Sequence, residues 1–168
     1  MDQPTLYDDD IVTWADEQVA ALRALAARSD LSNAVDWENV IEEIESVGRS
    51  DIERVESALA QMLIHILKYA SAPSAQSTRS WRTEVLLHHA AAEKTYRRSM
   101  RQRIDWDRLW TRSIRLARAA LDEFGDSLIA NLPDRLPFTP EELTAPDFDM
   151  DRGLERLAAV LKSPPDRH

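Results

Sequence analysis

The sequence has no cysteine and only three glycines among 168 residues. The absence of cysteine excludes disulfides, thiolate catalysis and zinc sites built on sulfur. The scarcity of glycine leaves few points at which a regular element must stop. Together these absences favour a protein of long, uninterrupted elements that does not depend on cross-links.

Long hydrophobic runs are also absent. The most apolar window, Met62–Leu67, contains His65 and stops before Lys68, which is far short of a membrane span. The first ten residues are acidic, whereas a secretory signal begins basic and continues apolar. We therefore expect a cytoplasmic protein without a membrane partner.

The motifs of common enzyme classes are missing. The sequence has no phosphate loop, dinucleotide fingerprint, His-Glu-x-x-His or Gly-x-Ser-x-Gly turn. It also lacks Glu-x-x-His, the pair that metal-binding helical bundles present inward. The adjacent His88 and His89 point to different sides of a helix and make a poor chelate. These absences argue against an enzyme without excluding one.

Charge is strongly segregated along the chain, whose net charge is −9. The net charge is −11 over residues 1–60, +8 over 61–121 and −6 over 122–168. Arginines between residues 97 and 118 supply most of the basic block, and arginine favours carboxylate or phosphate partners. We expect this block to pair with the acidic N-terminal third. Nucleic acid is the less favoured alternative, since the acidic flanks repel phosphate.

Apolar residues recur at helical spacing throughout, so we predict an all-α, single-domain helical bundle of about five main helices plus a C-terminal helix, over residues 1–168. Gly48 should end the second helix, and the capping-box pattern of Ser50 and Glu53 should start the third. The third helix should be the most buried, and the five tryptophans should be buried or half-buried. The predicted helices span about 8–25, 36–47, 51–70, 80–103 and 105–128, with a proline-interrupted segment over 131–148 and a last helix over 149–162.

Three carboxylates lie along one edge of the predicted second helix, which Asp36 should cap. Glu38, Glu42 and Glu45 are spaced four and three residues apart, so they project together and need water, a cation or a basic partner. We expect no cofactor and no metal. If an ion is held, Mg²⁺ or Mn²⁺ suits these carboxylates best, with His65 as a further ligand. Arg108, Arg112 and Arg115 repeat the same spacing and offer an ordinary counter-charge.

A second group of polar residues stands near the predicted helix junctions. His65 and Lys68 are one turn apart and would reach the acidic edge if the second and third helices pack side by side. Ser80 and Arg82 follow the linker around Pro73, where serine should cap a helix and arginine should pair with an acid. We predict a polar cluster of these residues with the acidic edge.

Several ordered motifs resemble one bacterial family. They are Tyr7, Asp10 and Trp14; Asp36-Trp37-Glu38; Glu42-Glu43-Ile44; Gly48-Arg49; His65-Ile66-Leu67-Lys68-Tyr69; Pro73; and Ser80-Trp81-Arg82. Over about residues 5–150 the chain is similar to the proteins grouped as domain of unknown function 29. The resemblance implies an all-helical bacterial domain and names no mechanism. The polar residues that match the family pattern are Asp36, Glu38, Glu42, His65, Lys68, Ser80 and Arg82, and the resemblance implies that any site lies among them.

We expect a binding or regulatory module that acts through protein contacts, with a partner protein or as a homo-oligomer. The first alternative is a metal-dependent hydrolase or other enzyme, with His65 as ligand or general acid and Arg82 as a clamp for an anionic substrate. In that case Glu38, Glu42 and Glu45 would be ligands or bases. The second alternative is a nucleic-acid-associated protein that uses the basic segment 97–118.

Overall fold

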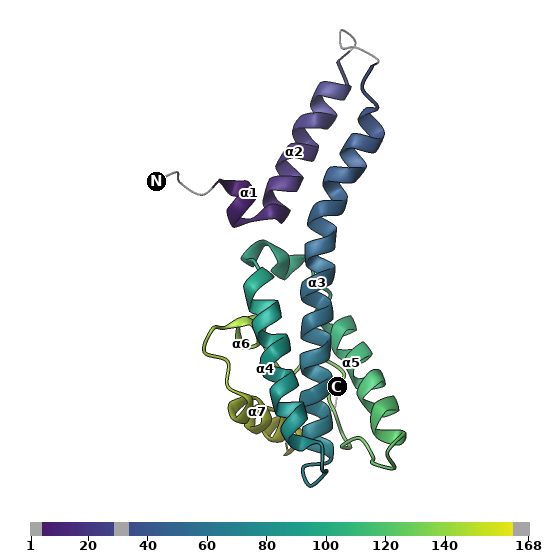
Figure 1. Cartoon of the computed structure of the whole chain (residues 1–168), viewed down its shortest axis with the longest axis vertical. Coiled ribbons are helices and arrows are strands. Elements are labelled where there is room, and N and C mark those ends of the chain that lie inside the picture. The colour runs from purple at the N-terminus through teal and green to yellow at the C-terminus, as the bar shows by residue number, and fades with distance from the viewer. Residues whose placement is uncertain (1–4, 29–33, 163–168) are drawn as a thin grey trace, which may run out of the picture. The chain divides into compact units, whose positions relative to one another are not determined.

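The computed structural model describes residues 5–28 and 34–162 (Figure 1). Every regular element in these ranges is a helix, which confirms the all-α prediction. No helix within them is long and apolar enough to cross a membrane. The helices are α1 (Leu6–Asp9), α2 (Ile11–Ala26), α3 (Trp37–Ser71), α4 (Thr78–Thr95), the 3₁₀ helix η1 (Arg98–Gln102), α5 (Trp106–Asp122), α6 (Pro140–Thr144) and α7 (Met150–Lys162).

The described chain divides into two compact units. The first contains the residues up to 54 together with 97–103, and the second contains 55–96 and everything from 104 onward. The helix α3 therefore contributes its N-terminal half to the first unit and its C-terminal half to the second. The expectation of a single domain stays a prediction.

Acidic residues begin and anchor the first unit. Asp10 caps α2 by accepting a hydrogen bond from the backbone nitrogen of Thr13 at 3.0 Å, and it accepts another from Ser99 Oγ at 3.0 Å. Arg103 pairs with Asp16 at 2.7 Å, and Arg97 Nε donates to the backbone oxygen of Asp9 at 2.5 Å. The expected pairing of the basic block with the acidic N-terminal third is thus found at residues 97–103.

The same contacts explain a wrong helix boundary. We predicted a helix over 80–103, but α4 ends at Thr95 and Tyr96 turns extended, with φ −58° and ψ 134°. The residues that follow bond to the start of α2 instead of continuing α4, and they form η1. At its other end α4 begins at Thr78, so Ser80 lies inside the helix and is not its cap.

Gly48 does not end a helix, and this prediction was wrong. The helix α3 runs unbroken for 35 residues, so Ser50 and Glu53 lie within it and cap nothing. Gly48 is buried against α2, where an added Cβ would lie 3.5 Å from Ala15 Cβ and 3.6 Å from Val12 Cα. Glycine therefore serves close helix packing here.

The C-terminal half of α3 is the centre of the second unit, as predicted. Six of its large side chains are fully or almost fully buried, namely Val55, Leu59, Met62, Leu63, Ile66 and Leu67. The tryptophans at 81 and 110 are buried and those at 14, 37 and 106 are half-buried, which also agrees with the prediction.

The fifth predicted helix is shorter than expected. It stops at Asp122, and Gly125 then takes a left-handed conformation with φ 76°. Because the chain leaves the helix there, Phe124, which the predicted helix over 105–128 would include, is 79% exposed.

The proline-containing segment is tied to its neighbours by single hydrogen bonds. Trp110 Nε1 donates to the backbone oxygen of Pro133 at 2.8 Å, and Asp107 accepts from the backbone nitrogen of Leu136 at 3.2 Å. Within the proline-interrupted segment, Thr139 and Glu142 form a capping box at the beginning of the short helix α6. The last helix, predicted over 149–162, is α7.

Candidate functional site

The acidic edge of α3 lies in the first unit. Asp36 caps the helix, since its carboxylate accepts from the backbone nitrogen of Asn39 at 3.3 Å. Glu45 pairs with Arg23 of α2. The three predicted carboxylates line a groove of about 500 Å³ together with two arginines and three apolar residues. The lining comprises Arg23, Ala26, Trp37, Glu38, Ile41, Glu42, Glu45 and Arg49.

The counter-charge of this edge is therefore local. Arg23 and Arg49 stand in the groove itself. Arg108, Arg112 and Arg115, which repeat the glutamate spacing, lie on α5 in the second unit, are exposed and form no ion pair within the described ranges. Their pairing with the acidic edge would join two separate units and stays a prediction.

His65 and Lys68 belong to a different unit from the acidic edge. The three glutamates stand on the half of α3 that contributes to the first unit, and His65 stands on the half that contributes to the second. The predicted cluster required a turn at Gly48 that would fold one helix beside the other. The helix α3 is continuous through that position, so the turn is absent and this premise of the cluster was wrong.

The structure surrounds His65 with different partners, all within the second unit. Its ring stacks at 6.1 Å and 7° on that of His88, and His88 Nε2 lies 3.4 Å from Glu84 Oε2. One ligand atom from each of His65, Glu84 and His88 lies within 4.8 Å of the others. Burial, and next the nearby charge of Lys68, lower the pKa of His65 from 6.5 to about 4, so its imidazole is neutral at pH 7.

Lys68 and Arg82 complete the polar surroundings of this cluster. The ammonium of Lys68 lies 4.9 Å from the centre of the Trp81 ring, and burial lowers the pKa of Lys68. Arg82 makes two hydrogen bonds to Asp151 of α7, at 2.9 and 3.0 Å, and lies over Tyr69. Its guanidinium is thus engaged by a carboxylate, as predicted for a pairing residue. Ser80 is exposed on α4 and belongs to no cluster.

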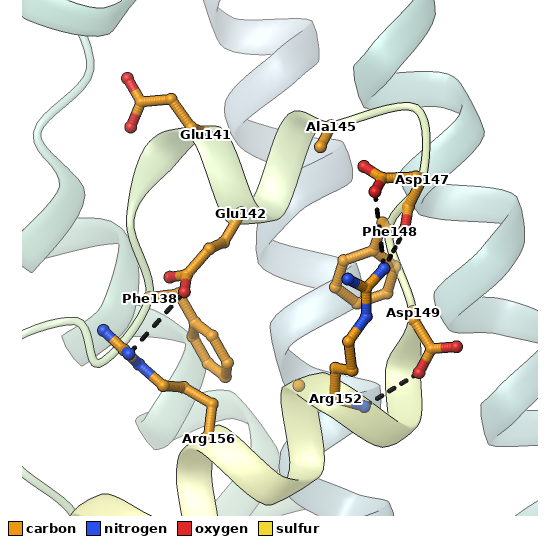
Figure 2. A pocket seen from close by; sticks show the side chains of 10 residues that line it. Phe138, Glu141, Glu142, Ala145, Asp147, Phe148, Asp149, Arg152 and Arg156 are labelled. Atoms are coloured by element: carbon orange, nitrogen blue, oxygen red, sulfur yellow. Dashed lines mark hydrogen bonds and ion pairs between the residues drawn. The ribbon is translucent and has the colours of Figure 1, made fainter.

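A separate pocket of about 330 Å³ lies between α6 and α7 in the second unit (Figure 2). Phe138 and Phe148 form its floor on either side of Gly153, and charged side chains surround its mouth. Behind the floor, the ring of His89 stacks on Phe148 at 4.9 Å, and His89 Nε2 lies 3.0 Å from the backbone oxygen of Ala145. The pocket is therefore anchored to α4.

Two arginines of α7 define the pocket's sides. Arg152 Nη2 donates to the backbone oxygen of Asp147 at 2.7 Å and lies 3.6 Å from its carboxylate. Arg156 Nε donates to the backbone oxygen of Pro137 at 3.0 Å, and its Nη1 lies 3.8 Å from the Glu142 carboxylate. Figure 2 shows these two arginines reaching to opposite sides of the opening.

The sequence analysis named none of the residues that line this pocket as site candidates. It also grouped His65 with the acidic edge, and not with Glu84 and His88. Glu84 and His88 stand four residues apart on one helix, a spacing that places both side chains on one face. That spacing was the available signal, although it does not reveal which residue of a neighbouring helix completes the group. The expectation that His88 and His89 face different sides was confirmed, since His88 faces His65 and His89 faces Phe148.

Comparisons with known proteins give two matches. The family model described as "Domain of unknown function DUF29" matches residues 6–149. A crystal structure of an alpha-helical protein of unknown function from Rhodospirillum rubrum is similar at a TM-score of 0.82 and 34% sequence identity, covering 93% of this chain and 99% of that chain. No curated protein matches the sequence.

Proposed function

We propose that this chain, which belongs to the DUF29 family, is a binding module. It holds a basic segment of a partner protein in the pocket between α6 and α7. The family description assigns no activity, so the support comes from the geometry of this chain. One observation carries the proposal, namely an aromatic floor beneath a predominantly acidic rim.

The floor suits an apolar stem of limited width. Gly153 leaves a space between the two rings, because an added Cβ would lie 3.7 Å from Phe148 Cζ and 3.9 Å from Phe138 Cε1. Phe138 is 6% exposed, so the floor is fixed by packing. A volume of about 330 Å³ is at the lower end of ligand pockets and suits one long side chain.

The rim selects a positive charge. Four carboxylates line the pocket, those of Glu141, Glu142, Asp147 and Asp149, against the guanidinium groups of Arg152 and Arg156. The two arginines already donate to backbone oxygens and face carboxylates, so the lining keeps a net negative charge. An arginine or lysine side chain fits both features, with its methylene stem on the phenylalanines and its charge at the rim.

The proposal is tested by nuclear magnetic resonance titration of the labelled protein with three blocked pentapeptides. The central residue is arginine, norleucine or glutamate, and the flanking residues are alanine. We expect the arginine peptide to shift the backbone signals of residues 138–156 and to bind at least about tenfold more tightly than the glutamate peptide, a difference of about 1.4 kcal/mol. Equal binding of all three peptides, or preference for glutamate, would refute the charge argument.

Gly153 offers a matched pair of variants. Gly153→Ala adds one methyl group at ordinary contact distance and should retain binding, whereas Gly153→Leu fills the space between the rings and should abolish it. Circular dichroism verifies that both variants fold. If Gly153→Leu binds the arginine peptide as the wild type does, the segment occupies another surface, and the second copy of this chain becomes the occupant to test by sedimentation.

We also propose that the module acts in the cytoplasm. A sequence without cysteine gains nothing from an oxidising compartment, which supports this placement. Fractionation of bacterial cells that express the chain tests it, and recovery in the periplasmic fraction would contradict it.

A further inference from the structure

We propose that His65 of α3 and Glu84 and His88 of α4 form a binding site for a late first-row divalent metal ion, of which Zn²⁺ is the representative. This site is independent of the pocket between α6 and α7. It goes beyond the proposed function because it adds a metal-dependent property to the second unit.

The distances between the three side chains suit a metal ion. Metal–ligand bonds of about 2.0–2.1 Å in a tetrahedral site place neighbouring ligand atoms about 3.3 Å apart. Glu84 Oε2 and His88 Nε2 are already 3.4 Å apart, and all three ligand atoms lie within 4.8 Å of one another. Side-chain rotation of His65 by roughly 1.5 Å closes the remaining gap.

The backbone around these ligands is held by the core. Glu84 and His88 are one turn apart on α4, which packs inward through the buried Trp81 and Val85. His65 stands on α3 between the buried Ile64 and Ile66. Because α3 and α4 are both fixed in this way, the cluster is positioned by rigid elements, as a metal site requires.

His65 has a nitrogen that packing leaves unused. Its Nδ1 is buried and has no hydrogen-bond partner within the described residues. The ring is also neutral at pH 7, which is the protonation state that binds metals. An imidazole with an unused nitrogen beside a second imidazole and a carboxylate is better explained by a ligand than by packing alone, since buried polar atoms are generally paired.

The chemistry of the three donors selects the ion. Two imidazole nitrogens and one carboxylate match Zn²⁺, Co²⁺ or Ni²⁺, whereas Mg²⁺ and Ca²⁺ prefer sites built from oxygen alone. This preference differs from that of the acidic edge of α3, for which Mg²⁺ or Mn²⁺ was the expected ion. Three protein ligands leave a tetrahedral position for water, an arrangement typical of reactive zinc sites.

Lys68 is the charge that opposes binding. It lowers the pKa of His65 by repulsion, and it would repel a cation in the same way. Its ammonium is held over the Trp81 ring, and the Glu84 carboxylate provides an opposing negative charge within the cluster. We therefore expect Lys68→Met to tighten metal binding.

The test is titration of untagged, metal-free protein with Co²⁺ at pH 7.5, followed by competition with Zn²⁺. We expect saturable visible absorption bands typical of tetrahedral Co²⁺ at a stoichiometry of one, displaced by Zn²⁺ and not by Mg²⁺. His65→Gln, His88→Gln and Glu84→Gln should each weaken binding at least about tenfold. No bands in wild-type protein at millimolar Co²⁺ would overturn the proposal.

His89→Gln is the matched control, because His89 is adjacent in sequence but faces Phe148 and Ala145 on another side of α4. It should bind Co²⁺ as the wild type does. Circular dichroism of each metal-free variant verifies folding before titration. If His65→Gln and His88→Gln fold and still bind with unchanged affinity, the ion is held elsewhere and the assignment is wrong.

Discussion

His65 links the packing of a single side chain to the pH dependence of the whole second unit. Its pKa is about 4 in the folded protein and about 6.5 when unfolded, so the unfolded chain takes up a proton more readily between these values. The contribution of His65 to stability is therefore complete above pH 6.5 and is lost as the pH falls towards 4. The charged or titratable groups around it are Lys68, Glu84 and His88.

We predict that His65→Gln reduces this loss. Urea unfolding at pH 7 and pH 5, with a chelator present, measures the free energy of unfolding of both proteins. The wild type should lose more between the two pH values, by at most about 2 kcal/mol, a bound that solvent around the half-buried ring reduces. An equal loss in wild type and His65→Gln would contradict the prediction.

At the residue scale, the sequence showed which residues make polar contacts better than it showed which residues they contact. His65 stood out because it interrupts the most apolar window of the chain, and Arg82 was correctly expected to pair with an acid. The partners themselves, Glu84, His88 and Asp151, come from other helices or from distant turns. Their distance depends on the register between helices, which is set by core packing and is not written in local spacing.

At the scale of an element, Gly48 is the position where local signals and packing disagree. A glycine before a capping-box pattern is typical of a helix boundary, yet the apolar positions on both sides continue on one face from Ile41 and Ile44 to Ile52 and Val55. Gly48, within that face, is buried against α2, and packing of this kind favours an unbroken helix. The apolar periodicity on both sides of Gly48 therefore predicted the extent of the helix better than the glycine and the capping-box pattern did.

We predict that Gly48→Ala stabilises the protein by about 0.5–1 kcal/mol, because alanine favours an interior helical position and its Cβ fits at 3.5 Å from Ala15. Gly48→Leu should destabilise it by about 1–3 kcal/mol by forcing α2 away. Thermal and urea unfolding measure both. A glycine that ended the helix in a left-handed conformation would give the opposite sign for alanine, so a destabilised Gly48→Ala would contradict the continuous helix.

Several hydrogen bonds hold the segment 131–138, and one of them comes from a buried donor on α5. The side chain of Trp110 is fully buried, and its indole nitrogen donates to the Pro133 oxygen at 2.8 Å. The sequence predicted that prolines exclude a long helix here, but not which donor would hold the segment, because any nearby polar hydrogen can bond a free carbonyl.

We predict that Trp110→Phe lowers the free energy of unfolding by about 1–3 kcal/mol, since it leaves the Pro133 oxygen without its donor and a smaller ring in the core. Urea unfolding measures the loss. Trp14→Phe, at a half-buried position in the first unit, is the comparison and should cost less. A similar loss for both variants would mean that the hydrogen bond to Pro133 contributes little.

At the scale of the whole molecule, charge is distributed differently from what the sequence suggested. Part of the basic block is satisfied within the first unit, where Arg97 and Arg103 bond to the start of the chain. Another part lies on the exposed side of α5, in the second unit. Arg108, Arg112, Arg115 and Arg118 are exposed there and form no ion pair within the described ranges. Among the described residues, this row is the surface that supports the nucleic-acid alternative.

The net charge of −9 opposes that alternative. Four arginines attract a polyanion at short range, but the acidic rest of the molecule repels it. This repulsion extends over a Debye length of about 8 Å at 0.15 M salt and over a longer distance at lower salt. We therefore predict no retention on heparin or duplex DNA at about 0.15 M salt, and at most weak retention near 0.02 M. Column elution across this range measures it. The contrary result is retention at 0.15 M salt that disappears in the double variant Arg112→Glu/Arg115→Glu and persists in the control Lys162→Glu. That result would show that α5 binds polyanions despite the net negative charge of the molecule. The nucleic-acid alternative would then replace the proposed peptide-binding function.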